Sequence, residues 1–255
     1  MSFREMVEGH THGHMLPYDA LEAMAKQGVT RAVSCAIVLM AEHAESYFDH
    51  FKVMRDFYRP LALSAGVNMY FALGIHPAGI PRDWQRVLKR LPEFLAGEEV
   101  VAVGEIGMNQ DSQLEKDVFR AQLEVAKDWE LPVIVHTPKQ HREYIVDVML
   151  DIAFKAGIAG DKLIIDHAHT DIIGQINGYG AIPGLTIREQ NLTPEQLVEN
   201  LESFAGGILN SDFSNLFNNN PIGMLDAVDY MIARGVDPGI IASLARDKAV
   251  QIYGL

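Results

Sequence analysis

The sequence predicts an α/β fold, a single-domain (β/α)8 TIM barrel, and three observations carry this prediction. Eight short apolar runs rich in β-branched residues alternate with amphipathic stretches, which is typical of parallel strands joined by crossover helices. The chain has 255 residues, close to the roughly 250 of such a barrel, so we expect one domain spanning residues 1–255. Histidine and carboxylate residues follow several of the runs, where the strands of a barrel would end.

The predicted strands are short and spread along the whole chain. The first is the weakest, and the others are apolar runs ending at glycine, polar or charged residues. Eight alternations in one chain favour a closed barrel over an open sheet. The strands are expected at residues 6–9, 32–39, 68–73, 100–103, 133–135, 163–165, 181–186 and 207–209.

Helices are predicted between the strands, several of them opening at a proline or a turn residue. Two more follow the last strand and would cover the side of the barrel. The polar run at residues 216–220, with three consecutive asparagines, is expected to form a loop that overhangs the site. The helices are expected at residues 17–27, 84–95, 113–129, 142–155, 194–204, 221–234 and 238–252.

Composition narrows the classes of partner. Lys and Arg total 21 against 34 Asp and Glu, a formal net charge of −13, so long nucleic acid is a poor partner and a small-molecule substrate is expected. No segment approaches the roughly 20 apolar residues of a membrane span, and we expect a cytoplasmic protein. Cys35 is the single cysteine, lies in an apolar run and is expected to be a buried thiol. The oligomeric state is left open.

Two histidines at the end of the first predicted strand form the strongest ligand signal. The two-residue period of a strand puts His10 and His12 on one side of the backbone, so both imidazoles can reach one cation. Chance placement in a histidine-rich segment is the alternative, and the position at a strand end favours metal binding. His14 continues the register but lies beyond the strand, which makes it a weaker candidate.

Four later strands also end in ligand-type residues, namely Glu105, His136, His167 and Asp212. Each alone would be a structural histidine, a salt-bridge partner or a turn residue, but their succession indicates a metal centre distributed around a barrel. Zinc, manganese and iron accept imidazole and carboxylate ligands, so we expect one or two divalent ions, with Zn²⁺ favoured over Mn²⁺ or Fe²⁺. We favour His167 over His169 as the ligand because it is nearer the strand.

Two carboxylates are predicted to take part in catalysis. Glu105 can bridge two ions, since one carboxylate can give an oxygen to each. Asp212 can hold one metal and accept the proton of a bound water, whose pKa falls from 15.7 to about 7 on zinc. The alternative for Asp212 is a helix N-cap or turn.

Four further residues are candidates for substrate binding. His76 follows the third strand and is either a substrate contact or a turn residue. Lys139, Arg142 and Arg188 are the cationic groups expected nearest the mouth of the barrel, where they can hold an anionic substrate. Solvated loop charge is the alternative for each of them.

The order of these residues resembles the TatD-like metal-dependent hydrolases of the amidohydrolase superfamily, over nearly the whole chain. The resemblance rests on His10-x-His12, Gly-Ile-His-Pro at 74–77, Val-Gly-Glu-Ile-Gly at 103–107, Pro-Val-Ile-Val-His-Thr at 132–137, then His167 and Asp212. It implies a distorted amidohydrolase-like barrel, a metal-bound hydroxide as nucleophile and hydrolysis as the reaction. The implied metal ligands are His10, His12, Glu105, His136, His167 and Asp212. Glu105, where the phosphotriesterase-like branch has a carboxylated lysine, favours the TatD-like branch.

The chain departs from the usual TatD pattern at several positions. Glu8 replaces the usual Asp, Asn210 and Ser211 replace the usual Glu-Thr, and Lys248 replaces the usual Asn of the last helix. The nearer resemblance is to an uncharacterised subgroup of barrel hydrolases with similar Gly-Ile-His-Pro and Asn-Ser-Asp elements. The deoxyribonuclease activity of better-known members is therefore not carried over.

These patterns lead to one main functional hypothesis and two alternatives. The main hypothesis is a metal-dependent hydrolase of a small substrate, with a phosphoester slightly favoured over an ester, lactone or amide. The first alternative is a non-catalytic metal-binding protein that serves a pathway or a scaffold. The second is a TatD-type deoxyribonuclease, for which the net charge of −13 provides no cationic track.

Overall fold

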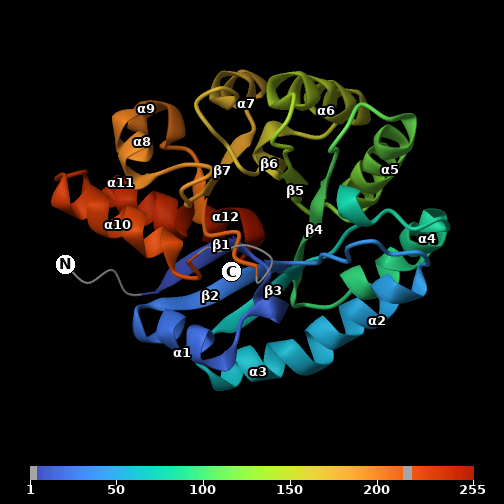
Figure 1. The fold of residues 1–255 in the computed structure, drawn as a ribbon, viewed down its shortest axis with the longest axis horizontal. Coiled ribbons are helices and arrows are strands. Elements are labelled where there is room, and N and C mark those ends of the chain that lie inside the picture. The colour runs from blue at the N-terminus through green and yellow to red at the C-terminus, as the bar shows by residue number, and fades with distance from the viewer. Residues whose placement is uncertain (1–4, 215–219) are drawn as a thin grey trace.

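The computed structural model describes residues 5–214 and 220–255, in which eight parallel strands form a near-closed barrel surrounded by helices (Figure 1). Each strand pairs with the next in the sequence. The strands are β1 (Met6–Thr11), β2 (Val29–Cys35), β3 (Asn68–Ala72), β4 (Val100–Gly107), β5 (Val133–His136), β6 (Leu163–Ile165), β7 (Ile182–Thr186) and β8 (Ile208–Asn210). The predicted fold class is confirmed.

Three strands differ from the prediction by more than one residue at an end, and all three differences bear on the site. Strands β1 and β4 are longer than expected, so His10 and Glu105 lie within strands rather than after them. Strand β2 begins earlier, at Val29, and ends at Cys35. The apolar residues Ile37 and Leu39, which look like the end of a strand in sequence, instead lie in the following loop and line a cavity.

The barrel closes where β1 meets β8. The backbone N–H of Asp212 donates to the carbonyl of His10 at 3.0 Å, and the N–H of His12 donates to the carbonyl of Phe213 at 2.9 Å. Gly9 permits this approach, because a Cβ there would lie 2.4 Å from the side chain of Ile208. Closure therefore places the first pair of histidines beside the carboxylate that follows the last strand.

Helices cover the outside of the barrel, and no helix in the described ranges is long and apolar enough to cross a membrane. Two helical segments were not predicted: α2 (Glu45–Val53) and α3 (Arg59–Ser64), which a π-helical turn at Met54–Tyr58 joins, and the short α7 (Ile173–Tyr179). Helix α2 buries Tyr47, Phe48 and Phe51 at helical spacing, a signal that was readable. The helices are α1 (Tyr18–Lys26), α2 (Glu45–Val53), α3 (Arg59–Ser64), α4 (Trp84–Leu95), α5 (Gln113–Asp128), α6 (Arg142–Ala156), α7 (Ile173–Tyr179), α8 (Pro194–Glu199), α9 (Leu201–Phe204), α10 (Gly223–Ala233), α11 (Pro238–Ala242) and α12 (Lys248–Tyr253).

The end of the chain packs against the inside of the barrel rather than only against its side. The helix expected at 238–252 is divided into α11, a π-helical turn at Ser243–Asp247, and α12. Ala249 and Tyr253 of α12 join the apolar cluster formed by Val7, Ile134 and Ile208 from the strands. Helix α12 lies near the middle of the ring of strands in Figure 1, so it seals one end of the barrel and leaves the carboxyl ends of the strands open.

The loop predicted at residues 216–220 lies outside the described residues except for Asn220. Cys35 is fully buried, as expected, and burial raises the pKa of its thiol to about 12.

Candidate metal centre

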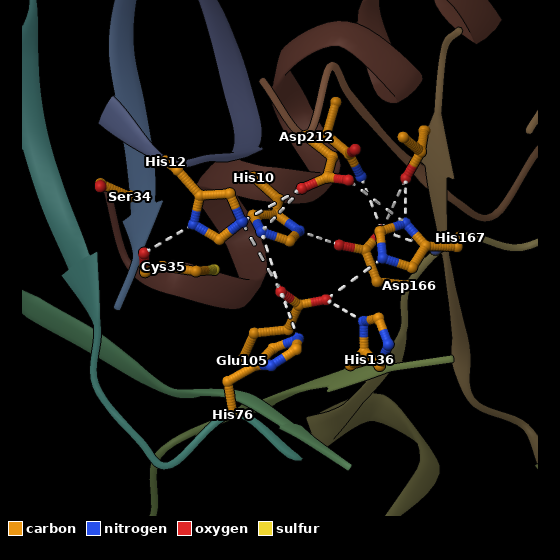
Figure 2. Close-up of polar contacts among 12 residues, drawn as sticks. His10, His12, Ser34, Cys35, His76, Glu105, His136, Asp166, His167 and Asp212 are labelled. Atoms are coloured by element: carbon orange, nitrogen blue, oxygen red, sulfur yellow. Dashed lines mark hydrogen bonds and ion pairs between the residues drawn. The ribbon is translucent and has the colours of Figure 1, made fainter. Parts of the chain in front are cut away.

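The structure brings the six predicted ligands together at the carboxyl ends of the strands (Figure 2). They come from both ends of the sequence and from five strands or the residues that directly follow them. All except His136 are almost completely buried. The six are His10, His12, Glu105, His136, His167 and Asp212.

Glu105 occupies the middle of the cluster, and its two oxygens face different partners. Oε1 lies 2.9 Å from Nδ1 of His136 and 3.2 Å from Nε2 of His167. Oε2 lies 3.5 Å from Nε2 of His10 and 3.8 Å from Nε2 of His12. With this division, each oxygen of Glu105 could contribute to holding a cation.

Asp212 faces the same pair of histidines from the opposite side. Its Oδ1 lies 3.6 Å from Nε2 of His10 and 3.3 Å from Nε2 of His12, while its Oδ2 accepts a 2.6 Å bond from Nη1 of Arg188. Asp212 and His167 both have left-handed backbone, with φ of 44° and 55°. Such values are uncommon for residues other than glycine and concentrate at functional sites, where the surrounding structure maintains them.

Two groups of ligand atoms have the spacing of metal sites, each with its atoms within 4.8 Å of one another. The first contains His10, His12, Glu105 and Asp212; the second contains His76, Glu105 and His136. Nε2 of His10 is buried and has no hydrogen-bond partner among the residues that the structure describes, so its lone pair is available to a cation. Nitrogen and carboxylate oxygen are the donors that zinc, manganese and iron accept, so the residues fit a divalent ion.

The electrostatic balance also fits a cation. Burial opposes ionisation of Glu105, but the charges of His10 and His136 hold its pKa well below the usual range. Burial likewise opposes ionisation of Asp212, and His167 lowers its pKa. Without a metal, positive charge on the histidines compensates these carboxylates. As metal ligands the histidines are neutral, and the carboxylates of Glu105, Asp166 and Asp212 then exceed the charge of Arg188 by two, which one divalent ion would neutralise.

Asp166 is a central residue of the site that the sequence analysis did not assign. Its Oδ2 lies in very short contact with Nδ1 of His10. Its Oδ1 accepts bonds from the backbone N–H of His167 at 2.9 Å, Nδ2 of Asn210 at 2.8 Å and Oγ1 of Thr186 at 3.2 Å. An ionised carboxylate only accepts hydrogen bonds, so the proton of a neutral His10 sits on Nδ1 and Nε2 keeps its lone pair.

His12 is oriented in the same way by a backbone group. Its Nδ1 lies 3.0 Å from the carbonyl oxygen of Cys35, which can only accept, so its Nε2 is the ligand atom. Below the histidines, Oε1 of Glu8 accepts bonds from the N–H groups of Ser211 at 2.8 Å and His10 at 3.3 Å. Burial raises the pKa of Glu8 to about 8, so this carboxyl adds little negative charge at neutral pH.

His76 lies inside the site rather than in a solvent-exposed turn. It is buried, its ring centroid is 4.6 Å from that of His136, and its Nε2 lies 3.9 Å from Oε2 of Glu105. Its Nδ1 accepts a 3.0 Å bond from the N–H of Ala78, so the Nε2 of a neutral His76 carries the proton. Asn109, which the sequence analysis did not assign, lies with its Oδ1 3.1 Å from Nε2 of His136.

Two histidines considered as ligands lie elsewhere. His169 pairs with Asp171, with Nδ1 3.1 Å from Oδ1, whereas His167 contacts Glu105 and Asp212. The structure thus favours His167, as the sequence analysis did. His14 packs edge-on against His50 with ring centroids 4.6 Å apart, outside both groups of ligand atoms.

A cavity of about 320 Å³ opens above the cluster, and all four residues predicted to bind substrate line it. Arg188 bonds to Asp212, Nη1 of Arg142 lies 3.5 Å from Asp171, and Nζ of Lys139 donates to Gln190 at 2.9 Å. The volume is at the lower end of the usual range for small-molecule sites, so it suits a compact ligand. The four residues are His76, Lys139, Arg142 and Arg188.

The family model and the relatives that match this chain are all of TatD-related or metal-dependent hydrolase type. The family model described as TatD related DNase matches residues 8–174. An uncharacterised metal-dependent hydrolase of Methanocaldococcus jannaschii is 33% identical over 214 residues, which are 83% of this chain and 85% of that protein. A second uncharacterised metal-dependent hydrolase, YjjV of Escherichia coli, is 31% identical over 142 residues, covering 53% of this chain and 51% of that protein.

Solved structures support the same fold. The TatD-like protein of Archaeoglobus fulgidus superposes with a TM-score of 0.84 at 27% identity, and the match covers 98% of this chain and 100% of that chain. The phosphotriesterase homology protein of Escherichia coli, solved with phosphate in its active site, gives a TM-score of 0.73 at 14% identity, covering 98% of each chain. The second similarity is one of fold alone.

Proposed function

The chain belongs to the TatD-related family of metal-dependent hydrolases, and from this premise we propose that it hydrolyses a small phosphoester at the centre built around Glu105. The observation that carries the proposal is the division of Glu105 between two groups of ligand atoms, directly below a cavity with three cationic side chains. Carboxylic esters, lactones and amides are the alternative substrates, because a metal centre can promote attack at phosphorus or at a carbonyl carbon.

The residues that would hold the metal form two sets that share Glu105. His10, His12 and Asp212 belong to the first set, and His136 and His167 face the other oxygen of Glu105. His76 is not assigned to the second set, because its Nδ1 accepts from Ala78 and its Nε2 keeps the proton. We propose zinc as the metal, with manganese or iron as alternatives. When bound, a divalent ion lowers the pKa of water and polarises the bond to be broken.

The remaining steps are assigned to side chains of the chain. We propose that a carboxylate oxygen of Asp212 accepts the proton of the attacking water, with Glu105 fixing the ligand geometry around it. Arg188, Arg142 and Lys139 would hold the anionic group, and Nε2–H of His76 can donate a hydrogen bond to substrate.

A turnover panel tests the proposal. The zinc-loaded protein should hydrolyse at least one phosphomonoester or phosphodiester, and the Glu105→Gln variant should not. A folded, metal-loaded protein that hydrolyses nothing in a panel of phosphoesters, carboxylic esters, lactones and amides would favour the non-catalytic role. Hydrolysis of DNA with salt-sensitive binding would favour the nuclease alternative, which the formal charge of −13 does not support.

A further inference from the structure

The cavity above the metal centre has two chemically different walls. Ile37 and Leu39 come from the loop that follows β2, whereas Lys139 follows β5 and Arg188 follows β7. The strands run in sequence order around the barrel, so two strands, β1 and β8, separate β2 from β7, and two others, β3 and β4, separate β2 from β5 (Figure 1). The apolar residues and the cationic residues therefore reach the cavity from different parts of the barrel rim.

The apolar wall exposes side chains that a ligand could cover. Leu39 is 42% exposed and Ile37 is partly buried, and both line the cavity. A backbone hydrogen bond holds this loop, since the N–H of Met40 donates to the carbonyl of Ala78 at 3.3 Å. An apolar group that covers Ile37 and Leu39 removes their surface from water, which favours binding in proportion to the area covered.

The cationic wall holds a guanidinium with unused donor capacity. Arg188 has a side chain only 14% exposed, and while its Nη1 bonds to Asp212, its Nε is buried without a partner in residues 5–214 and 220–255. Arg142 also lines the cavity, with its Nη1 3.5 Å from Oδ1 of Asp171. Two carboxylates line this side of the cavity, the exposed Glu189 and Asp212, which bonds to Arg188, so the three cationic side chains exceed them by one charge. A guanidinium can give two parallel hydrogen bonds to a phosphate, which makes Arg188 the receptor for an anionic head.

We propose that the substrate is an amphiphilic phosphate monoester, with its phosphate between the metal centre and Arg188 and a compact apolar group against Ile37 and Leu39. This inference rests on the proposed function and names its substrate class. The cavity of about 320 Å³ limits the apolar group to a short alkyl chain or a single aromatic ring. In the reaction, water oxygen bonds to phosphorus, the P–O bond to the apolar alcohol breaks, and the products are the alcohol and inorganic phosphate, with the water protons shared between them.

A chain-length series tests the apolar wall. For methyl, butyl and hexyl phosphate, kcat/KM of the zinc-loaded protein should rise, with an upper limit of roughly fourfold per methylene until the cavity is filled. The Leu39→Ser variant should lose much of this dependence. The matched control is Leu63→Ser on α3, which makes the same change at a leucine that is 63% exposed and outside the cavity lining, and it should keep the dependence. A flat series in the unsubstituted protein would overturn the inference while leaving the proposed function intact.

A binding measurement separates failure of this inference from failure of the proposed function. Butyl- and hexylphosphonate have a P–C bond that hydrolysis does not break, so calorimetry with the zinc-loaded protein measures recognition without turnover. Hexylphosphonate should bind more tightly than butylphosphonate, and Arg188→Gln should weaken it by roughly ten- to hundredfold, with Arg188→Lys retaining part of the affinity. If no ester is hydrolysed but this order is seen, the proposed function fails, and an amphiphilic phosphate stands as the class of ligand that the cavity binds. Equal affinities for the two phosphonates would overturn the inference.

Discussion

Replacing Asp166 by asparagine tests how the metal centre is positioned. The carboxylate is fully buried, and its two oxygens contact His10 on one side and His167, Thr186 and Asn210 on the other. An asparagine that keeps the three bonds to one oxygen turns its amide N–H₂ toward Nδ1 of His10. Nδ1 must then accept, so the proton of a neutral His10 moves to Nε2, the atom that faces Glu105 and Asp212.

The expected loss follows from that change of tautomer. Substitution of outer partners of metal-ligating histidines typically weakens metal binding by roughly 10- to 100-fold, or about 1.4 to 2.7 kcal/mol. We expect Asp166→Asn to fall in the upper half of this range, because the amide blocks the ligand atom as well as loosening the ring. His12 has its own backbone partner, so it should keep its orientation.

Competition with a chromophoric chelator measures zinc affinity in the variant, and thermal unfolding of the metal-free proteins checks the fold. Asp161→Asn is the matched control, since it makes the same change at an exposed residue just before β6. It should bind zinc as the unsubstituted protein does. Equal zinc affinities for Asp166→Asn and Asp161→Asn would refute the reasoning, whereas a lower melting temperature without a change in affinity would mean a structural role only.

Four further predictions address the centre and the fold. Glu105→Gln should lower metal content and activity together, because the amide lacks the charge to serve two cations; unchanged metal content by elemental analysis would show that Glu105 is not a ligand. Asp212→Asn should keep most of the metal but lower kcat by roughly 10²- to 10⁴-fold with near-normal substrate affinity, and ordinary turnover would move the base elsewhere. Chelation should abolish activity and zinc should restore it; activity that survives metal removal to less than about 0.2 ion per chain would contradict metal dependence. Burial lowers the pKa of His50 from 6.5 to about 4, so the folded state excludes a proton that the unfolded chain takes up, and stability should fall as pH falls from 6.5 to 4. His50→Gln should remove up to roughly 3 kcal/mol of that fall in denaturant titrations at pH 7 and pH 4, and equal falls in both proteins would argue against the shift.

The sequence was most informative where periodicity and position agree. Apolar runs alternating with helical stretches predicted the eight-stranded parallel barrel, because only a limited set of layer arrangements buries that pattern. It was less informative at boundaries. Ile37 and Leu39 continue an apolar run, yet they leave β2 to line the cavity, and sequence alone does not distinguish a buried strand from an apolar loop over a site. Helix α7 was missed because it is short and contains Gly174 and Gly178, which favour helix weakly.

The metal ligands could be predicted from sequence because the carboxyl ends of parallel strands meet at one face of the barrel. The groups that orient those ligands were not. The carbonyl of Cys35 has no sequence signature, and Asp166 looked like the polar end of a strand until the fold placed it against His10, 156 positions away. The contact of Asp166 with His10 joins the end of β6 to β1 and depends on closure of the barrel, which no local pattern encodes.

The departure from the usual TatD pattern at Asn210 has a structural explanation in its contact with Asp166. Where that pattern has Glu, this chain has Asn210, whose Nδ2 donates to Oδ1 of Asp166 at 2.8 Å. A glutamate at this position would bring a second carboxylate against a fully buried one, and two such groups cannot both ionise without strong repulsion. The amide instead supplies a donor and keeps Asp166 charged toward His10. The change at position 210 is thus compatible with the metal centre, because the carboxylate that orients His10 comes from the end of β6. The role of a polar residue at the end of one strand therefore depends on the residue that faces it from another strand.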